Sequence, residues 1–312
     1  MKIAFVGLGS IGIRHLNNVY KYLSEKGEAF EVDAFRSGKG KELPKEVTTL
    51  LTNVYFEEPD TVNKQYDAVF VTNPSSKHLE TMEKFFDYTK TFFVEKPVFD
   101  TTEVDRATVE KFSQKLCYVA CPLRYNPVLE YVAKNIDLSK VISAKAISSS
   151  YLPDWRPGTD YRKCYSAHKD MGGGVHLDLI HEWDYLTNFF GYVKEGFSII
   201  DKVSNLEIDS ADCAIYIAKT EKALIELHLD YFGRKTLREL TLFTENDTIE
   251  CDIQNGRVSF LKSGKEEKLV FERNDFQMKE IRHFFDIVAG KTENDNSVYH
   301  AMKVLEYARG EF

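Results

Sequence analysis

A glycine-rich turn near the start of the chain most constrains the fold. Gly7, Gly9 and Gly12 form a GxGxxG pattern between residues 2–6, which predict a strand, and residues 13–23, whose apolar side chains recur at helical spacing. In this context the glycines allow a tight turn and close approach of a pyrophosphate, and the helix N-terminus offers N–H groups to phosphate oxygens. A chance glycine loop is the weaker alternative. We expect contacts to a dinucleotide cofactor from Gly7, Gly9, Ser10, Ile11 and Gly12.

The first third of the chain alternates strands and helices. Further strands are expected at residues 30–35, 68–72, 91–94 and 118–121, and a helix over residues 104–116. This alternation predicts a parallel sheet covered by helices on both faces, as in a Rossmann domain. We place this domain at residues 1–121.

The pattern changes after Pro122. Six successive strands are expected at residues 212–220, 223–232, 236–244, 248–253, 258–262 and 268–272, separated by turn residues. Two helices, around residues 276–288 and 298–309, are expected to follow. The fold class is therefore α/β at the N-terminus, with an α+β second domain at residues 122–312 whose sheet is antiparallel.

Composition narrows the class of protein. The chain has 312 residues, of which 43% are hydrophobic and 29% charged, and its formal net charge is −8. The acidic balance argues against nucleic acid or an anionic membrane as the main partner. Neither a secretory leader nor a spanning segment of about 18–20 apolar residues is recognised. The five cysteines form no CxxC pair, which favours reduced thiols, and we expect a cytoplasmic protein.

The end of the second predicted strand bears on the choice of cofactor. There a carboxylate would bind the ribose 2′-hydroxyl of NAD, whereas strand alternation places Arg36 rather than Asp33 at the tip. Arg36, with Ser37 and Lys39 nearby, could pair with a 2′-phosphate, which favours NADP over NAD. The alternative is that Arg36 and Lys39 are solvated loop charges.

Two later strands end in polar turns that contain proline. The first is Thr72-Asn73-Pro74 and the second is Glu95-Lys96-Pro97. Ligands of such sheets bind beyond the carboxyl ends of the strands, where a lysine could polarise a substrate hydroxyl. Taken alone, a Lys-Pro pair at a strand end is more often an exposed edge.

These motifs together resemble the glucose–fructose oxidoreductase / inositol dehydrogenase (Gfo/Idh/MocA) family. They are the N-terminal GxGxxG, Thr72-Asn73-Pro74 followed by His78, Glu95-Lys96-Pro97, and a Gly-Gly-Gly run before an Asp and a His on a helix. The resemblance implies a Rossmann domain, a second domain with a large open sheet, and homodimers or homotetramers assembled through that sheet. It also implies NAD(P)-dependent oxidation or reduction of a sugar, cyclitol or nucleotide sugar. Residue by residue, it gives Lys96 and Asp178 catalytic roles, and Thr72, Asn73, His78, Glu95 and Lys96 contacts with the cofactor.

The stretch 172–186 departs from the common family spacing, because His181 follows Asp178 at i+3 and Glu182 stands at i+4. On one continuous helix, Asp178, His181, Glu182 and Tyr185 would share one polar stripe. We favour His181 as the base, since imidazole titrates near neutral pH, and Glu182 remains the alternative or a substrate contact. Gly172–Gly174 would let a ligand approach the backbone.

Other substrate contacts are expected before that helix. Arg124 and Tyr125 open the second domain as the family motif does, and Trp155, Arg156 and Tyr161 combine aromatic and cationic side chains in one loop. As an alternative, this loop spans the domain and Trp155 is buried.

The sequence thus predicts a dehydrogenase in which Lys96, Asp178 and His181 are catalytic and no metal takes part. The run His181-Glu182-Trp183-Asp184-Tyr185 resembles a subgroup that often accompanies the synthesis of bacterial surface sugars. Two alternatives stay open: a non-catalytic dinucleotide-binding sensor or regulator on the same fold, and a reductase for a non-sugar carbonyl.

Overall fold

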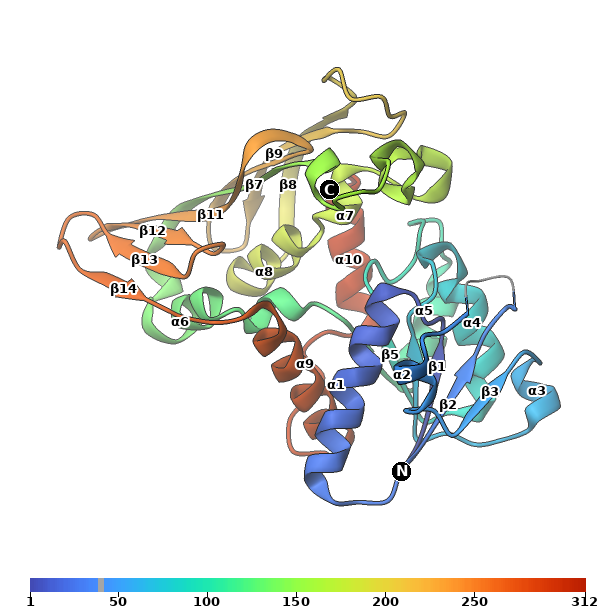
Figure 1. The fold of residues 1–312 in the computed structure, drawn as a ribbon. Coiled ribbons are helices and arrows are strands. Elements are labelled where there is room, and N and C mark those ends of the chain that lie inside the picture. The colour runs from blue at the N-terminus through green and yellow to red at the C-terminus, as the bar shows by residue number, and fades with distance from the viewer. Residues whose placement is uncertain (39–41) are drawn as a thin grey trace. The chain divides into compact units, whose positions relative to one another are not determined.

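The computed structural model describes residues 1–38 and 42–312 and divides into two compact units (Figure 1). Unit 1 comprises Met1–Cys121 and Gln277–Met302, and unit 2 comprises Pro122–Phe276 and Lys303–Phe312. One unit holds a parallel sheet and the other a large, open, mostly antiparallel sheet. The expected fold class is confirmed. The domain limits 1–121 and 122–312 stay a prediction, and by packing residues 277–302 are part of unit 1.

The sheet of unit 1 is parallel and has the strand order β3-β2-β1-β4-β5-β6. Its strands are β1 (Lys2–Val6), β2 (Glu31–Phe35), β3 (Asn53–Tyr55), β4 (Ala68–Val71), β5 (Thr91–Val94) and β6 (Leu116–Val119). β1 lies in the middle and pairs with β2 on one side and β4 on the other. The chain order therefore reverses beside β1, which puts the glycine turn at the topological switch point where such sheets bind ligands.

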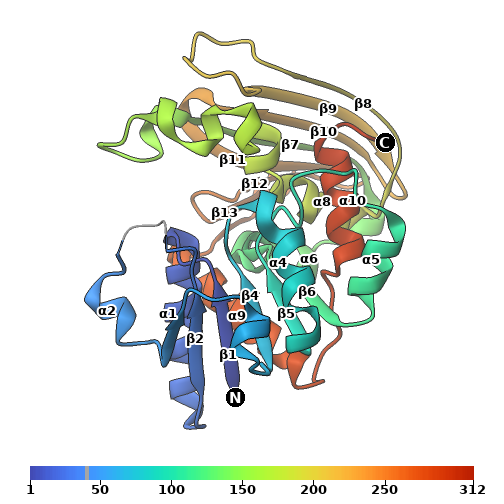
Figure 2. The same ribbon diagram turned by 90° about the vertical axis from the view of Figure 1, so that its right-hand side faces the viewer.

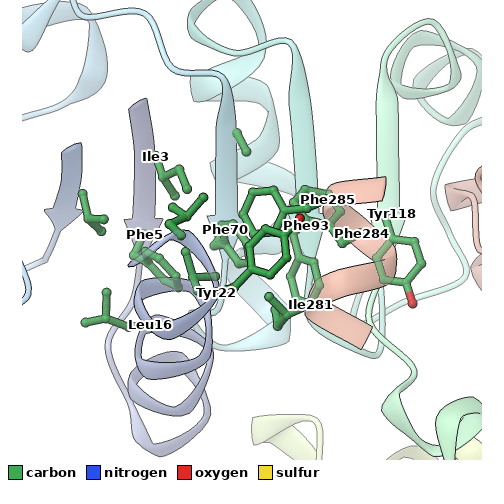
Figure 3. Close-up of a cluster of buried hydrophobic side chains, with 14 of the residues drawn as sticks. Ile3, Phe5, Leu16, Tyr22, Phe70, Phe93, Tyr118, Ile281, Phe284 and Phe285 are labelled. Carbon is green, nitrogen blue, oxygen red and sulfur yellow. The ribbon is translucent and has the colours of Figure 1, made fainter. Parts of the chain in front are cut away.

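Helices cover both faces of this sheet. They are α1 (Ser10–Lys26), α2 (Lys45–Thr48), α3 (Pro59–Val62), α4 (His78–Phe85), α5 (Arg106–Ser113) and α9 (Arg273–Val288). Phe5, Phe70 and Phe93 point from neighbouring strands to the face packed by α1 and α9, as Figure 3 shows. On the other face Phe92 meets Phe112 of α5. Apolar runs such as 68–71 and 91–94 suit strands that are buried on both faces.

Helix α9 belongs to the core of unit 1 although it follows the second sheet in sequence. The Phe284 ring lies 5.4 Å from that of Phe70 and 5.2 Å from that of Phe93, and Phe285 stacks on Tyr22 of α1. Beyond the helix, Asn296 exchanges hydrogen bonds with the backbone of Val119 in β6. This segment thus completes one face and one edge of the parallel sheet.

Unit 2 holds a sheet with the strand order β14-β13-β12-β11-β7-β10-β9-β8 (Figures 1 and 2). Its strands are β7 (Val141–Tyr151), β8 (Val193–Asp201), β9 (Cys213–Thr220), β10 (Leu224–Asp230), β11 (Phe232–Thr244), β12 (Thr248–Asp252), β13 (Arg257–Phe260) and β14 (Glu266–Lys268). All pairs are antiparallel except β7 with β10. The sheet has two ends, β14 and β8, and is therefore open.

One face of this sheet is covered and the other is exposed. The covered face packs against α6 (Pro127–Asn135), α7 (Val175–Asp178), α8 (His181–Phe190) and the end of α10 (Val298–Ala308). Tyr216 of β9 is buried there against Trp183, whereas Ile215 and Ile217 of the same strand are exposed. This alternation is typical of a sheet with only one buried face.

The structure differs from the sequence predictions in several elements. β3, β7 and β8 were not expected, and β7, which lies in the middle of its sheet, turns the expected meander into a mixed sheet. The single helix expected to carry Asp178, His181, Glu182 and Tyr185 is two helices, with Leu179 and Ile180 between them. Among the described residues, no helix combines the length and the apolar character that a membrane span requires.

The core position of α9 can be tested with Phe284→Ala. Phe284 is fully buried against three aromatic rings of the sheet, so the cavity should lower the free energy of unfolding by about 3–5 kcal/mol. Urea denaturation followed by fluorescence measures this change. Phe56→Ala is the matched control, because Phe56 is 62% exposed and its loss should cost under about 0.5 kcal/mol. Equal effects of the two substitutions would contradict the packing described.

Candidate functional site

The glycine turn of unit 1 forms a cradle that side chains would fill. A Cβ on Gly12 would lie 2.4 Å from the carbonyl oxygen of Gly7, and one on Gly7 would lie 2.6 Å from Asn73. A Cβ on Gly9 would instead meet open space, and Gly9, the N-cap residue of α1, provides no side-chain cap. Ser10 is exposed and Ile11 half-buried beside it. Exposed N–H groups at an uncapped helix start fit a dinucleotide pyrophosphate.

The acidic side chain of β2 is enclosed. Asp33 is fully buried and accepts hydrogen bonds from Lys64 (2.7 Å), Tyr66 (2.9 Å) and Asn53 (2.9 Å). β2 ends at Phe35, so Arg36, which is half-buried, and the exposed Ser37 follow the strand. Lys39, expected nearby, lies outside the described residues. Within the described part of the chain, the carboxylate of Asp33 thus forms its hydrogen bonds with other residues of the protein.

The loops after β4 and β5 are tied together. His78 is buried, with Nε2 3.0 Å from the carbonyl oxygen of Asn73 and Nδ1 3.1 Å from that of Pro97. Burial lowers the pKa of His78, although these carbonyl contacts act in the opposite direction. Thr72 donates its hydroxyl to the Gly7 carbonyl at 2.5 Å, which attaches the end of β4 to the glycine turn. Thr72, Asn73 and His78 therefore hold the turn in shape, and their contacts with a cofactor stay predictions.

Glu95 and Lys96 follow β5 directly. Glu95 is 9% exposed, and its Oε1 lies 2.5 Å from Nε2 of His15 on α1. Its Oε2 accepts the backbone N–H of Lys96 at 3.1 Å. Burial raises the pKa of Glu95, but the hydrogen bond and charge of His15, together with Lys96 and His78, outweigh it and lower the pKa overall. Lys96 itself is half-buried.

In unit 2, Asp178 ends the short helix α7 and accepts two tyrosine hydroxyls. Tyr165 donates to one carboxylate oxygen at 2.7 Å, and Tyr231 donates to the other at 2.6 Å. Asp178 is 8% exposed and Tyr231 is fully buried. Burial, followed by the charge of Asp178, raises the pKa of Tyr231, which therefore stays a donor at neutral pH. The cluster holds the carboxylate in one orientation.

The polar stripe expected on one continuous helix does not form. Asp178 lies in α7, whereas His181 and Glu182 begin α8 beyond the break at Leu179, whose φ is −99° and ψ 30°. His181 is half-buried, but Glu182 is fully buried and pairs with Arg238 of β11 at 2.7 Å. The two tyrosines hold Asp178 and the arginine of β11 holds Glu182, so the two carboxylates have separate partners. These partners lie on either side of the break between α7 and α8.

Two further side chains of the α8 region also have internal partners. Arg124 is buried and makes a bidentate pair with Asp184, at 2.6 and 2.7 Å. Tyr125 beside it is half-buried. A buried guanidinium held by a carboxylate orients the segment that carries it. The substrate contacts predicted for Arg124 and Glu182 stay predictions, and the structure gives both groups a packing role.

The loop after β7 surrounds the Asp178 cluster. Trp155 packs edge-on against Tyr231, with ring centroids 5.2 Å apart, and Arg156 lies 5.7 Å from the Tyr165 ring. Trp155 is half-buried and Arg156 exposed. A small cavity in this loop is lined by Leu152, Pro153, Trp155, Arg156, Thr159, Tyr161, Cys164 and Ser166. Three of the predicted substrate contacts thus border one cavity.

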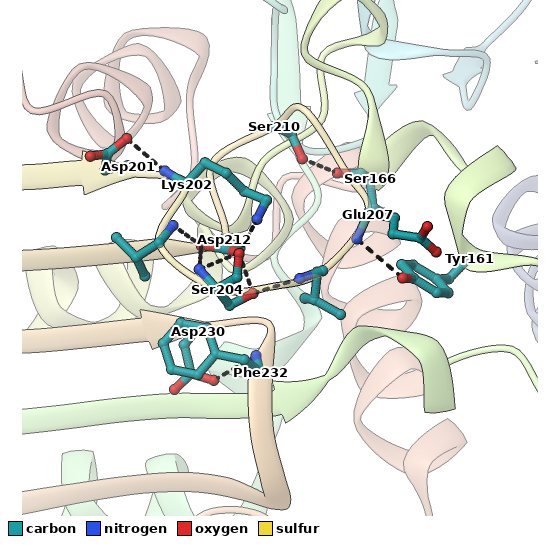
Figure 4. A network of polar contacts seen from close by, with 12 residues as sticks. Tyr161, Ser166, Asp201, Lys202, Ser204, Glu207, Ser210, Asp212, Asp230 and Phe232 are labelled. Carbon is teal, nitrogen blue, oxygen red and sulfur yellow. Dashed lines mark hydrogen bonds and ion pairs between the residues drawn. The ribbon is translucent and has the colours of Figure 1, made fainter.

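The loop between β8 and β9 fastens this segment, as Figure 4 shows. Asp212 is fully buried and accepts the N–H of Val203 at 2.7 Å and the hydroxyl of Ser204 at 2.5 Å. From the same loop, Ser210 donates its hydroxyl to the carbonyl oxygen of Ser166 at 2.6 Å. The backbone N–H of Glu207 donates to the Tyr161 hydroxyl at 3.2 Å. Tyr165 is therefore carried by a braced segment.

The N-terminal part of the chain is similar to a known protein family. A model of an oxidoreductase family with an NAD-binding Rossmann fold, Gfo/Idh/MocA, matches residues 1–120. Residues 1–120 thus match the NAD-binding domain of the Gfo/Idh/MocA oxidoreductase family. The family resemblance noted in the sequence is confirmed.

A curated relative of this chain is scyllo-inositol 2-dehydrogenase (NAD(+)) from Bacillus subtilis (strain 168). It is 24% identical over 196 residues, which are 61% of this chain and 54% of the relative. The chain thus spans about half the length of the curated relative it matches.

Solved structures share the fold of the whole chain. UDP-N-acetylglucosamine 3-dehydrogenase from Acidithiobacillus ferrooxidans has a TM-score of 0.78 at 17% identity, covering 100% of this chain and 96% of that one. Scyllo-inositol dehydrogenase from Lactobacillus casei, with bound NAD(H) and scyllo-inositol, has a TM-score of 0.77 at 17% identity with the same coverage. Levoglucosan dehydrogenase, in complex with NADH and levoglucosan, has a TM-score of 0.80 at 14% identity, covering 100% and 98%.

Within this chain, the predicted site residues gather in two places, one in each unit. Unit 1 brings the glycine turn, Thr72, Asn73, Glu95 and Lys96 to one edge of its sheet, and unit 2 brings Trp155 and Arg156 around Asp178. The described residues contain no group of three or more His, Cys, Asp or Glu side chains suited to a metal ion.

Sequence reasoning missed three residues of these clusters. His15 was detectable as a histidine on the apolar side of α1, but Tyr165 and Tyr231 carry no distinctive signal, since tyrosine is common in loops and strands. Gly173 was expected to admit a ligand. Instead a Cβ there would lie 2.2 Å from the carbonyl oxygen of Tyr165, so the close approach is to the chain itself.

The bracing of the Tyr165 segment can be tested with Asp212→Asn. An amide cannot accept all the hydrogen bonds of the carboxylate, so the free energy of unfolding should fall by about 1–3 kcal/mol at pH 7. Burial raises the pKa of Asp212, but Ser204, the backbone N–H groups and Lys202 lower it overall. The carboxylate therefore stabilises the fold above its unfolded pKa of about 4, and this advantage is lost as the pH falls through the lowered folded value.

Urea denaturation between pH 7 and pH 3 measures this difference. Asp170→Asn, at an exposed position of the same unit, is the control and should change the free energy of unfolding by under about 0.5 kcal/mol. A difference between the wild type and Asp212→Asn that grows as the pH falls would contradict the assignment.

Proposed function

We propose that the protein is a nicotinamide-dependent dehydrogenase or reductase that acts on a CH–OH group of a sugar, cyclitol or nucleotide sugar. The observation that carries the proposal is the pairing, in one unit, of a glycine cradle that fits a dinucleotide with Lys96 at the end of β5. The names of the relatives support the substrate class, since they include a cyclitol, an anhydrosugar and a nucleotide-sugar dehydrogenase. A role in surface-sugar synthesis is the finer proposal and rests on the residue run 181–185.

In this proposal each catalytic residue has one task. The bound nicotinamide supplies hydride transfer to or from the substrate carbon. In the oxidation direction, Lys96 binds and polarises the reacting oxygen, and His181 accepts the hydroxyl proton while the C–H bond gives up its hydride. Asp178, held by Tyr165 and Tyr231, binds and orients the substrate or the base.

His181 is favoured over Glu182 as the base on burial and pairing. Glu182 is fully buried, and its carboxylate lies 2.7 Å from the guanidinium of Arg238, which stabilises the ionised form. His181 is half-buried and stands at the start of α8. A proton acceptor needs access to the substrate, so His181 suits the task better.

Loss of either proposed catalytic side chain should slow turnover. Lys96→Ala and His181→Ala should lower kcat by about 10²–10⁴-fold and leave the Kd for cofactor within about threefold, since a positioned proton-transfer group contributes about that much. The measurements are nicotinamide absorbance with a panel of sugars and cyclitols, and cofactor fluorescence titration. Lys90→Ala, at an exposed lysine, is the control and should match the wild type.

Two outcomes would contradict this assignment. A larger loss of kcat in folded Glu182→Gln than in His181→Ala would make Glu182 the base. Tight cofactor binding with no turnover of any sugar in either direction would favour a non-catalytic dinucleotide-binding sensor.

The cofactor is proposed to be NAD or NADP, with the preference set at Arg36. The NAD-binding family and the NAD(H)-bound relatives support NAD. A preference for NADP is the finer proposal. It is supported by the enclosure of Asp33, whose oxygens are held by Lys64, Tyr66 and Asn53, and by a cation at the strand end.

Arg36→Ala separates the two cofactors. If Arg36 pairs with a 2′-phosphate, the Kd for NADPH should rise by about 10–100-fold, the equivalent of one charged hydrogen bond, and the Kd for NADH by under about threefold. Fluorescence titration with both cofactors measures this, with Lys90→Ala as the control. Equal losses for the two cofactors, or a wild type that binds NADH more tightly, would remove the 2′-phosphate assignment.

We also propose a homodimer or homotetramer formed through the exposed face of the second sheet. Phe197 and Ile199 of β8 and Ile215 and Ile217 of β9 lie exposed on that face in adjacent, paired positions. A contiguous apolar patch of this kind is typical of a surface that a second copy covers.

A further inference from the structure

A buried histidine and a buried glutamate join two elements of unit 1. His15 is fully buried on α1, and Glu95 follows β5 with 9% exposure. The His15 Nε2 and Glu95 Oε1 atoms are 2.5 Å apart, although 80 residues separate them in the chain. Among the described residues the imidazole has no other hydrogen-bond partner.

The direction of this hydrogen bond follows from charge. The lowered pKa of Glu95 makes it a carboxylate at neutral pH, and a carboxylate only accepts hydrogen bonds. Nε2 of His15 is therefore the donor. A buried carboxylate that lost this donor would keep its desolvation cost without compensation.

Each oxygen of Glu95 thus has one donor, and the two donors lie on different elements. Oε1 accepts from His15, and Oε2 accepts the backbone N–H of Lys96 at 3.1 Å. Because both oxygens belong to one rigid carboxylate, the direction of the first hydrogen bond fixes the second. The position of the Lys96 backbone is thus linked to α1 through Glu95.

His15 also stands on the helix that begins at the glycine turn. α1 starts at Ser10, so His15 lies less than two turns from Gly9. The ring packs edge-on against Phe93 of β5, with centroids 4.9 Å apart and an interplanar angle of 67°. One side chain therefore connects the dinucleotide-binding helix with the strand that presents Lys96.

We propose that His15 is a positioning residue that acts through Glu95 to hold Lys96 in its working position relative to the dinucleotide turn. The part of this proposal that concerns catalysis rests on the function proposed above. The part that concerns the backbone of Lys96 is a property of unit 1 alone.

The test uses two substitutions of His15 in the full chain. His15→Phe keeps an aromatic ring against Phe93 but removes the donor, whereas His15→Gln keeps an N–H donor near the Nε2 position. The primary measurement is hydrogen exchange of the Lys96 amide, by NMR or by mass spectrometry of peptides that contain it. We expect exchange at least about tenfold faster in His15→Phe and within about threefold of the wild type in His15→Gln.

A kinetic measurement follows the same pair of variants. His15→Phe should lower kcat at least about tenfold with the Kd for cofactor within about threefold, and His15→Gln should restore most of the loss. In a Lys96→Ala background His15→Phe should have no further effect on kcat, because its action passes through Lys96. A residue with only a packing role would lower stability without this dependence.

If His15→Phe does not fold, Glu95→Gln provides the second test. His15 and the Lys96 N–H lie at different oxygens, and in a glutamine one of these positions is an NH2 group that cannot accept a hydrogen bond, so the Lys96 amide should again exchange at least about tenfold faster. Unchanged Lys96 exchange in a folded variant, or equal effects of His15→Phe and His15→Gln, would overturn the proposal. Altered exchange of the Lys96 amide in a protein that turns over no sugar would refute the proposed function but leave the positioning role of His15 intact.

Discussion

Two buried carboxylates on α8 constrain how this helix packs within unit 2. Glu182 and Asp184 both point from α8 into the interior, where an unpaired charge would be strongly destabilising. Arg238 from β11 and Arg124 from the segment before α6 neutralise them. Each pair therefore fixes the rotation of α8 against a different neighbour. The break at Leu179 and Ile180 lies directly before this helix and separates Asp178 from His181.

The parallel half of the fold was the more predictable half. The expected strands 2–6 and 91–94 coincide with β1 and β5, because apolar runs bounded by glycine or proline have few other uses in a buried sheet. The glycine turn and the residues that end β4 and β5 also follow from general rules of such sheets. The sequence therefore predicted that the glycine turn follows β1 and that Lys96 follows β5.

The remaining part depends on contacts between distant residues. β7 contains Ser, Ala and Lys and becomes a central strand only because β10 and β11 pair with it on either side. Helical periodicity assigned Glu182 to an accessible polar stripe, but its partner Arg238 lies 56 positions later and no local pattern reveals it. The same holds for His15 and Glu95. Periodicity describes a single helix or strand, whereas each of these side chains is positioned by a contact between two different elements.

Residues 277–302 belong to unit 1 although they follow the second sheet in the chain, so a single cut cannot separate the two units. A fragment that ends at Cys121 would lack the helix that covers Phe70 and Phe93 and the segment that pairs with β6. The nucleotide-binding half is thus not a contiguous gene segment. To produce unit 1 alone, α9 would have to be joined to residues 1–121 through a designed linker. A chimera that exchanges the second sheet must take residues 1–121 and 277–302 from the same parent.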